Sequence, residues 1–240
     1  MYIYKKRAFT LAEVLITLGI IGVVAALTMP SLIAKYKERE TVVKLKKMYS
    51  VISQAYQQVL NDNGDPTNWG LTGTNAASAN IVLARFTPYL KISKNCGSAS
   101  GCFPNVTYKG LNNTNVVNIN TSTVHTGRAI LNDGMSIYFY VQSKDCNITY
   151  SGAANVCANV GVDINGFNPP NQLGKDLFDF TITTDRVVPY GIAGATGEAS
   201  FETDCLTGYG WGCAAWVVTN ENLDYLHCKN LSWSGKTKCN

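Results

Sequence analysis

Eight cysteines are the residues of this 240-residue sequence whose chemistry is most evident, and all of them lie after residue 90. None stands in a C-x-x-C pair, the spacing with which a zinc site usually holds its metal from one tight turn. An even number without such pairs favours disulfides in an oxidising compartment. Pairing of near neighbours, Cys96 with Cys102 and Cys146 with Cys157, is one arrangement among many that the sequence leaves open. The disulfide candidates are Cys96, Cys102, Cys146, Cys157, Cys205, Cys213, Cys228 and Cys239.

Two histidines, His125 and His227, are the other groups suited to acid–base or metal chemistry. His227 stands beside Cys228, but adjacent side chains rarely project to the same point, and an oxidised cysteine is no nucleophile. The sequence also lacks a G-x-S-x-G elbow, a Walker loop, a dinucleotide fingerprint and an H-E-x-x-H motif. We therefore predict no catalytic residue and no enzyme activity.

A loop at residues 163–178 carries side-chain oxygens at short intervals around Gly166. Hard Ca²⁺ prefers oxygen ligands, although the distal glutamate of an EF-hand is missing and the loop offers few carboxylates. The alternative, which we favour, is a strand connection whose Asn, Gly and Pro residues satisfy turn geometry. No other cofactor is expected. The calcium candidates are Asp163, Asn165, Asn168, Asn171 and Asp176.

One carboxylate, Glu13, lies inside an apolar segment at residues 9–29. That run is about 21 residues long, roughly the length that a helix needs to cross the hydrocarbon core of a bilayer. A carboxylate in lipid costs several kcal/mol unless it is neutralised or paired. We therefore expect Glu13 to need a partner that its own helix does not supply.

A short basic leader supplies a route to that partner. Lys5, Lys6 and Arg7 stand directly before Ala8 and Phe9. Cleavage after Ala8 would create an ammonium group at Phe9, and in a neighbouring subunit this cation could pair with the buried carboxylate. A secretory signal peptide would instead have a shorter apolar region and a small-residue cleavage site after it.

The segment KKRAFTLAEVLITLGIIGVVAALTMP resembles the prepilin-type N-terminal cleavage and methylation motif of type IV pilins and type II secretion pseudopilins. The resemblance covers the first quarter of the chain. It implies that a prepilin peptidase cleaves after Ala8, that Phe9 is N-methylated and that Glu13 guides assembly. Gly22 and Pro30 fall where such pilins have helix-weakening residues. Ala8 departs from the glycine usual before the cut, so processing should be slower or need a permissive peptidase.

The elements that must position these groups begin with a long helix. After the span, Leu45, Met48, Ile52, Ala55 and Val59 repeat at close to helical spacing. Together with the span they predict a helix of about 50 residues, roughly 75 Å long, with a kink or fraying between residues 22 and 30. It should stop at the turn cluster of residues 61–66. A coiled coil is the alternative for its outer half.

The remainder predicts a small antiparallel sheet. Residues 128–131 and 135–141 flank an Asn-Asp-Gly turn and predict a hairpin. Further strands are expected at residues 160–164, 177–183 and 216–218, and helical turns at residues 79–89 and 220–226. Four strands laid on one long helix give an α+β head, stapled by disulfides, which is also what the resemblance implies.

The expected organisation has five parts: a leader at residues 1–8, a transmembrane and assembly helix at 9–30, an amphipathic helix at 31–60, a variable connecting region at 61–127, and the sheet with the cysteine-rich region at 128–240. Aromatic residues near the C-terminus either fill a disulfide-stapled core or form a recognition surface. These aromatic residues are Tyr209, Trp211, Trp216, Tyr225 and Trp233.

Taken together, these features predict a structural subunit of a type IV pilus or a type II secretion pseudopilus. The resemblance implies a single-pass protein of the bacterial inner membrane that later joins a periplasmic or cell-surface filament. Its partners would be the prepilin peptidase, other pilin subunits, and the assembly platform with its ATPase. The net charge of +4 is modest, and nothing in the distribution of basic residues resembles a nucleic-acid-binding face. The alternatives are a minor tip pilin that binds a surface or substrate, and a membrane-anchored extracytoplasmic enzyme.

Overall fold

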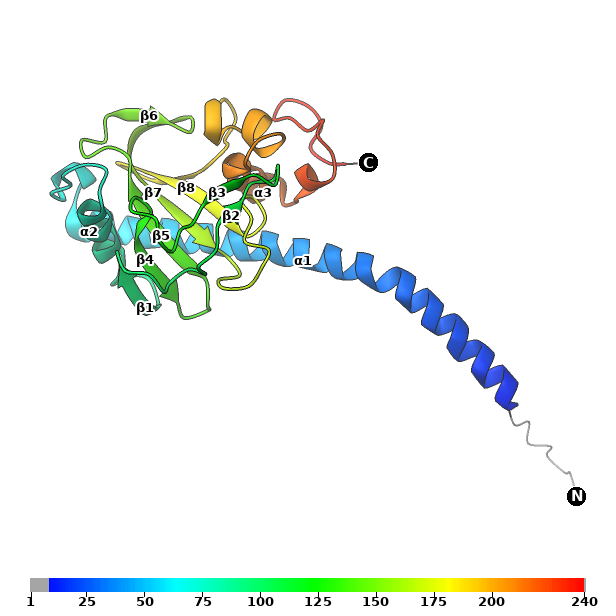
Figure 1. The fold of residues 1–240 in the computed structure, drawn as a ribbon. Coiled ribbons are helices and arrows are strands. Elements are labelled where there is room, and N and C mark those ends of the chain that lie inside the picture. Colours follow the sequence, from blue (N-terminus) through cyan, green and yellow to red (C-terminus); the bar gives the residue numbers. More distant parts are fainter. Residues whose placement is uncertain (1–8, 240) are drawn as a thin grey trace, which may run out of the picture. The chain divides into compact units, whose positions relative to one another are not determined.

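The computed structural model of the protein describes residues 9–239. The chain divides into two compact units, Met1–Glu40 and Thr41–Asn240. The long helix α1 (Leu11–Asn63) begins in the first unit and ends in the second. Figure 1 shows this helix in blue and cyan, with the strands of the second unit in green and yellow.

In the first unit α1 runs without a break through Gly22 and Pro30. The kink or fraying expected between these residues therefore does not interrupt the helix. Its Leu, Ile and Val side chains are exposed, as at Leu15, Ile20 and Leu27. A helix that exposes apolar side chains around its surface is stable only where lipid or other protein covers them.

In the second unit one stripe of α1 is buried, and it includes all five positions predicted from the sequence: Leu45, Met48, Ile52, Ala55 and Val59. Tyr56 extends the stripe and donates a hydrogen bond from its hydroxyl to the carbonyl of Thr183. The helix ends at Asn63, close to the predicted stop. Gly64 follows with φ +69°, and its N–H bonds the carbonyl of Leu60 at 2.9 Å. Glycine adopts this left-handed conformation without steric cost.

Seven antiparallel strands form the main sheet. Their order is β1 (Ile92–Gly97), β4 (Thr126–Leu131), β5 (Ser136–Val141), β7 (Ala153–Asp163), β8 (Leu177–Thr183) and β9 (Val187–Pro189), and β6 (Ile148–Tyr150) pairs with β7. A second sheet joins β2 (Tyr108–Lys109) to β3 (Asn115–Val117). The fold is α+β, as predicted, but the main sheet is larger than the four strands expected.

The two faces of this sheet differ because side chains alternate along each strand. Phe139, Val160 and Phe180 lie on one face and belong to the same buried cluster as the α1 stripe. Their neighbours on the other face include Tyr138 and Asp179, which are also buried. One face is therefore the apolar core of the unit, and the opposite face holds polar groups that must find partners within the protein.

The predicted hairpin is confirmed as β4 and β5. Ala129 pairs with Ile137, and Gly134 in the turn has φ +85°. The strands at residues 160–164 and 177–183 correspond to the C-terminal part of β7 and to β8. The short strands β1, β6 and β9 lack a clear alternation of apolar and polar residues, which is why the sequence pattern did not reveal them.

The helices of the second unit lie partly outside the predicted ranges. α2 (Ala76–Phe86) begins three residues before the expected helix, because Asn75 caps it by accepting from the N–H of Ser78 at 2.9 Å. The prediction of a strand at residues 216–218 is wrong, because these residues lie in helix α3 (Ala214–Asn220). A short apolar run fits a strand or a buried helix equally well, and here it follows two alanines. The remaining short helices are η1 (Pro66–Asn68), η2 (Gly197–Ala199), η3 (Phe201–Cys205), η4 (Trp211–Cys213) and η5 (Asp224–Leu226).

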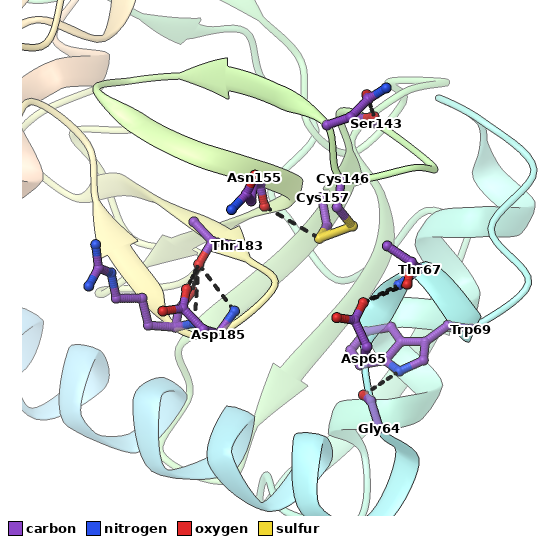
Figure 2. Close-up of a disulfide and its surroundings, with 12 residues drawn as sticks. Gly64, Asp65, Thr67, Trp69, Ser143, Cys146, Asn155, Cys157, Thr183 and Asp185 are labelled. Carbon is purple, nitrogen blue, oxygen red and sulfur yellow. Dashed lines mark hydrogen bonds between the residues drawn. A yellow bond between two sulfur atoms is a disulfide. The ribbon is translucent and has the colours of Figure 1, made fainter.

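All eight cysteines form disulfides between consecutive cysteines. The pairs are Cys96–Cys102, Cys146–Cys157, Cys205–Cys213 and Cys228–Cys239, and the first two are the near-neighbour pairs that the sequence leaves open as one arrangement among many. Figure 2 shows Cys146–Cys157, which ties the segment after β5 to β7, with Asn155 and Thr183 nearby. The same view shows Asp65 accepting from Thr67 where α1 gives way to η1.

The aromatic residues near the C-terminus mainly fill a core. Trp216 is fully buried and stacks on Phe201 with ring centroids 3.9 Å apart. Trp233 packs against both rings, and Tyr225 is buried beside Phe201. Of the five aromatic residues predicted for this region, Tyr209 is exposed and Trp211 is half-buried.

The α1 stripe supports a test with identical chemistry at two sites. Val59 is fully buried and Val43 is 67% exposed on the same helix. We expect Val59→Ala to lower the free energy of unfolding by about 2 kcal/mol, because it removes buried methyl groups and leaves a cavity. Val43→Ala should change it by less than about 0.5 kcal/mol. Urea unfolding of the full chain in mild detergent measures both, and equal effects would contradict the described packing.

Candidate functional site

The first turn of α1 holds the carboxylate singled out in the sequence. The backbone N–H and the Oγ1 hydroxyl of Thr10 both donate to Oε2 of Glu13 at 2.8 Å. In return the N–H of Glu13 donates to Thr10 Oγ1 at 3.2 Å. This reciprocal arrangement is a capping box, which satisfies donors at the start of a helix.

The capping box corrects one expectation from the sequence. We expected Glu13 to find no partner within its own helix, but Thr10 supplies two hydrogen bonds. Neither donor carries a charge, so the carboxylate keeps its need for a cation. Sequence reasoning missed Thr10, although Thr-x-x-Glu before an apolar run is a readable capping signal.

The surroundings of Glu13 are apolar and exposed. Phe9, at the start of the described residues, is 88% exposed, and Leu11 is 79% exposed. α1 is long and apolar enough to cross a membrane by length and composition, with a mean hydropathy of 2.3 over its most apolar 18 residues. None of that window is buried within the protein. The segment therefore presents an uncovered apolar surface with one carboxylate near its N-terminal end.

The basic leader and the cleavage position lie outside the described residues. The predictions for Lys5, Lys6, Arg7 and Ala8 therefore stay predictions, as does the N-methylation of Phe9.

The loop predicted as a calcium candidate brings two carboxylates together at the C-terminal end of β7. Asp163 is fully buried and accepts from the hydroxyl of Tyr108 and, at 3.1 Å, from the N–H of Asn165. Asp176 accepts from the N–H groups of Asn171 at 2.7 Å and Gln172 at 2.6 Å. Both carboxylates are thus held by donors of the chain itself, which favours the turn interpretation.

The other calcium candidates take part in the same turn. Asn165 Nδ2 bonds the carbonyl of Pro169 at 3.1 Å, and Asn168 Nδ2 bonds the carbonyl of Asn165 at 3.0 Å. Among the described residues no group of three or more His, Cys, Asp or Glu side chains is arranged to hold a metal ion. Calcium binding through the loop amides stays a prediction.

Burial shifts the acid–base behaviour of these carboxylates. Removal from water raises the pKa of Asp163 to about 8, and the nearby Asp176 adds to the rise. Burial also raises the pKa of Asp176 to about 6, against the lowering effect of its backbone donors. The two histidines lie in different surroundings. His125 packs against the rings of Tyr138 and Trp211, and His227 follows η5.

Two protein families match the chain. The prokaryotic N-terminal methylation motif matches residues 3–29, and the family of unknown function DUF6613 matches residues 31–191. No curated protein and no solved structure matches it. The second match covers the outer half of α1 and the main sheet through β9, and the aromatic C-terminal region lies beyond it.

A methylation motif that runs into a long apolar helix, followed by a disulfide-bearing α+β unit, defines a type IV pilin-like protein. The prediction made from the leader and Glu13 is therefore confirmed at the level of the protein class. Within that class, this chain belongs to the family of unknown function DUF6613, whose match spans more than half of its 240 residues.

The raised pKa of Asp163 generates a prediction about pH. Its folded-state pKa of about 8 lies above the ordinary value of 3.8, so the folded protein holds a proton that the unfolded chain has lost. The stability contributed by this carboxyl is therefore fully present below about pH 4 and is lost as the pH rises toward 8, by roughly 1.4 kcal/mol per pH unit. Denaturant unfolding of the full chain at pH 5, 6.5 and 8 measures the decline.

Asp163→Asn mimics the protonated acid and should reduce this pH dependence by the share of one group, while Asp176 and Asp179, whose pKa values burial also raises, keep theirs. Asp145→Asn, at an exposed aspartate paired with Lys144, provides the matched control and should leave the slope unchanged. A wild-type stability that rises from pH 5 to pH 8, or a slope that Asp163→Asn leaves intact, would show that this carboxyl does not stay protonated in the folded protein.

Proposed function

We propose that the protein is a structural subunit of a type IV pilus or of a type II secretion pseudopilus. The observation that carries this proposal is the uncovered apolar segment of α1 with Glu13 in its first turn, which lies within the match to the methylation motif at residues 3–29. Neighbouring copies of such a segment can cover one another's apolar surface in a filament core. The head then remains at the filament surface as a folded, oxidised unit.

The charge of Glu13 gives the assembly its specificity. Removal of the leader after Ala8 creates an ammonium group at Phe9, close to the cap formed by Thr10. In a lipid-like filament core the carboxylate of one subunit is stabilised by this ammonium of the next. An unprocessed subunit lacks the free amine, so it does not provide the partner.

The same proposal assigns the location and the partners. The leader stays in the cytoplasm, residues 9–30 span the inner membrane, and the disulfide-bearing head folds on the oxidising side. The prepilin peptidase, related subunits and the assembly platform with its ATPase are the partners. The role is structural and not enzymatic.

A minor subunit at the filament tip is the second candidate. One observation favours it: the second unit contains a polar, aromatic-lined pocket that a purely structural subunit does not need. Quantitative mass spectrometry of purified filaments distinguishes the two, because a tip subunit is present at a small fraction of the major subunit.

Glu13→Ala tests the charge argument. We expect the variant to be processed normally and to enter filaments at least about 10-fold less than wild type, since about 1.4 kcal/mol of lost pairing suffices for that factor. Shed-filament immunoblots measure the amount in cells that carry the assembly machinery. Glu202→Ala, an exposed carboxylate of the head, is the control and should assemble as wild type. Unchanged assembly of Glu13→Ala would contradict the proposal.

The N-terminus of the mature protein gives an independent test. Intact-mass and peptide mass spectrometry should find a chain that begins at N-methylated Phe9 and carries four disulfides. Ala8→Phe should retain the leader, because a bulky side chain blocks the peptidase, and should stay out of filaments. A wild-type chain found in cells with the leader still attached would argue against a processed filament subunit.

A further inference from the structure

The face of the sheet opposite α1 carries an unusual buried arrangement. In the strand register, Tyr138 of β5 and Asp179 of β8 both pair with Gly161 of the intervening β7. The ring of Tyr138 lies across this glycine, and its hydroxyl donates to Asp179 Oδ1 at 2.5 Å. A Cβ atom at Gly161 would come within 2.1 Å of that ring. Tyr138 can therefore reach Asp179 because Gly161, which lies between them on β7, has no side chain.

A pocket of about 310 Å³ opens over this arrangement. That volume falls in the range of small-molecule sites. Residues of β5 to β8, η2 and η4 line the pocket, so its walls come from elements that are distant in sequence. Its lining residues are Val124, His125, Tyr138, Tyr140, Gln142, Tyr150, Asn159, Asp179, Tyr190, Glu198 and Trp211.

Two buried acceptors of the lining have no hydrogen-bond partner in the part of the chain that the structure describes. Asp179 is 2% exposed and its Oδ2 is unpartnered, while Oδ1 takes the bond from Tyr138. Asn159 is 3% exposed and its Oδ1 is unpartnered. A buried acceptor without a donor costs free energy, so both atoms call for a ligand that donates hydrogen bonds.

The charge of the pocket favours a cation. Asp179 and Glu198 line it, and among residues 9–239 neither Lys nor Arg belongs to the lining. Burial, assisted by the nearby Arg128, lowers the pKa of His125 to about 4, which leaves this imidazole neutral at physiological pH. Arg128 is not itself part of the lining, and its Nη1 and Nη2 groups donate to the carbonyls of Ser98, Ala99 and Ser122, while its Nε has no partner among the described residues.

Aromatic rings surround the same space. His125 packs edge-on against Tyr138 at 4.9 Å between centroids and parallel to Trp211 at 6.3 Å. Tyr150 and Tyr190 meet edge-on, with their ring centroids 5.7 Å apart. Ring faces attract cations, and they also shield the alkyl part of an organic ligand from water.

We propose that this pocket binds a small organic cation through a primary ammonium group, which donates to Asp179 Oδ2 and Asn159 Oδ1 while the aromatic rings enclose its alkyl chain. A primary ammonium offers donors only, in keeping with two vacant acceptors and an acidic lining. A sugar could also stack on the rings, but its hydroxyls bring no charge to match Asp179. The site is separate from the assembly segment and does not depend on the proposed function.

The protonation of Asp179 adds a signature to this binding. Burial raises its pKa to about 7, against the lowering effect of the Tyr138 hydrogen bond. The other ionisable groups facing the pocket are His125 from the segment before β4, Tyr140 from β5, Tyr150 from β6, Tyr190 after β9, and Glu198 from η2. An ammonium favours the carboxylate, so binding releases a proton below about pH 7 and tightens as the pH rises from 6 to 8.

The test titrates the full chain, in an uncharged detergent, with n-butylammonium chloride. Calorimetry at pH 8 should give saturable binding with a Kd at or below about 10 mM, a modest affinity for so few atoms. Binding should weaken at pH 6. Tetramethylammonium, which donates no hydrogen bond, and glucose, which carries no charge, should each bind at least about 10-fold more weakly. Absence of butylammonium binding to the wild-type chain, or tighter binding of glucose, would overturn the proposal.

Two variants locate the site. Asp179→Asn keeps an acceptor for Tyr138 and removes the charge, so butylammonium should bind about 10-fold more weakly or worse. Asp163→Asn is the matched control. Asp163 is also a buried aspartate that accepts a hydrogen bond from a tyrosine, but Asp163 does not line the pocket. Its affinity should equal that of wild type.

Trp211→Leu gives a second route if Asp179→Asn does not fold. The half-buried ring lies at the wall of the pocket, and its loss should weaken butylammonium binding roughly threefold to tenfold with the melting temperature little changed. Wild-type affinity in both Asp179→Asn and Trp211→Leu would place the binding elsewhere and contradict the assignment.

Discussion

The contact between the α1 stripe and the apolar face of the sheet is the interaction on which the second unit depends. Leu45, Ile52 and Val59 are fully buried there, in one cluster with Phe139 and Phe180. The cluster joins residues that lie more than a hundred positions apart in sequence, and the strands between them are held in register by that burial. The same helix continues toward its N-terminus as a segment with no buried side chain in its most apolar window. One continuous element therefore serves a protein core at one end and an apolar environment outside the chain at the other.

This division of the sheet sets the chemistry of its second face. Because most apolar side chains of β5, β7 and β8 belong to the cluster that contains the α1 stripe, polar groups such as Asp163 and Asp179 form a buried polar layer on the opposite face. Asp163 meets Tyr108 in that layer, and Asp179 meets Tyr138. A buried carboxyl held by a tyrosine hydroxyl avoids some of the cost of leaving water, and the rest appears as a raised pKa. The buried polar layer therefore forms on one face of the sheet because the other face is filled by the apolar core.

Sequence reasoning worked best where one local pattern was strong. The span, the stripe of α1 and the hairpin around Gly134 were predicted from periodicity and turn chemistry alone. Reasoning failed where structure is decided by distant contacts. The strand expected at Trp216 is a helix because its short apolar run packs against Phe201, and nothing local distinguishes the two. The pocket was invisible for the same reason. Tyr138 and Asp179 become neighbours only through the register of three strands, and no spacing along the chain records that Gly161 stands between them.

The disulfides have a consequence for how the protein matures. Each of the four bridges joins two consecutive cysteines, across separations of 6, 11, 8 and 11 residues. Short loops of this kind restrict the unfolded chain less than long ones, so their contribution to global stability is the smaller part of their effect. Their pairing has a second property, because it is the pairing that oxidation in order of emergence would generate. When the cysteines enter an oxidising compartment in the order of the sequence, each bridge can close before the next pair of cysteines arrives. Correct connectivity then follows from the order of synthesis, without a search among alternatives.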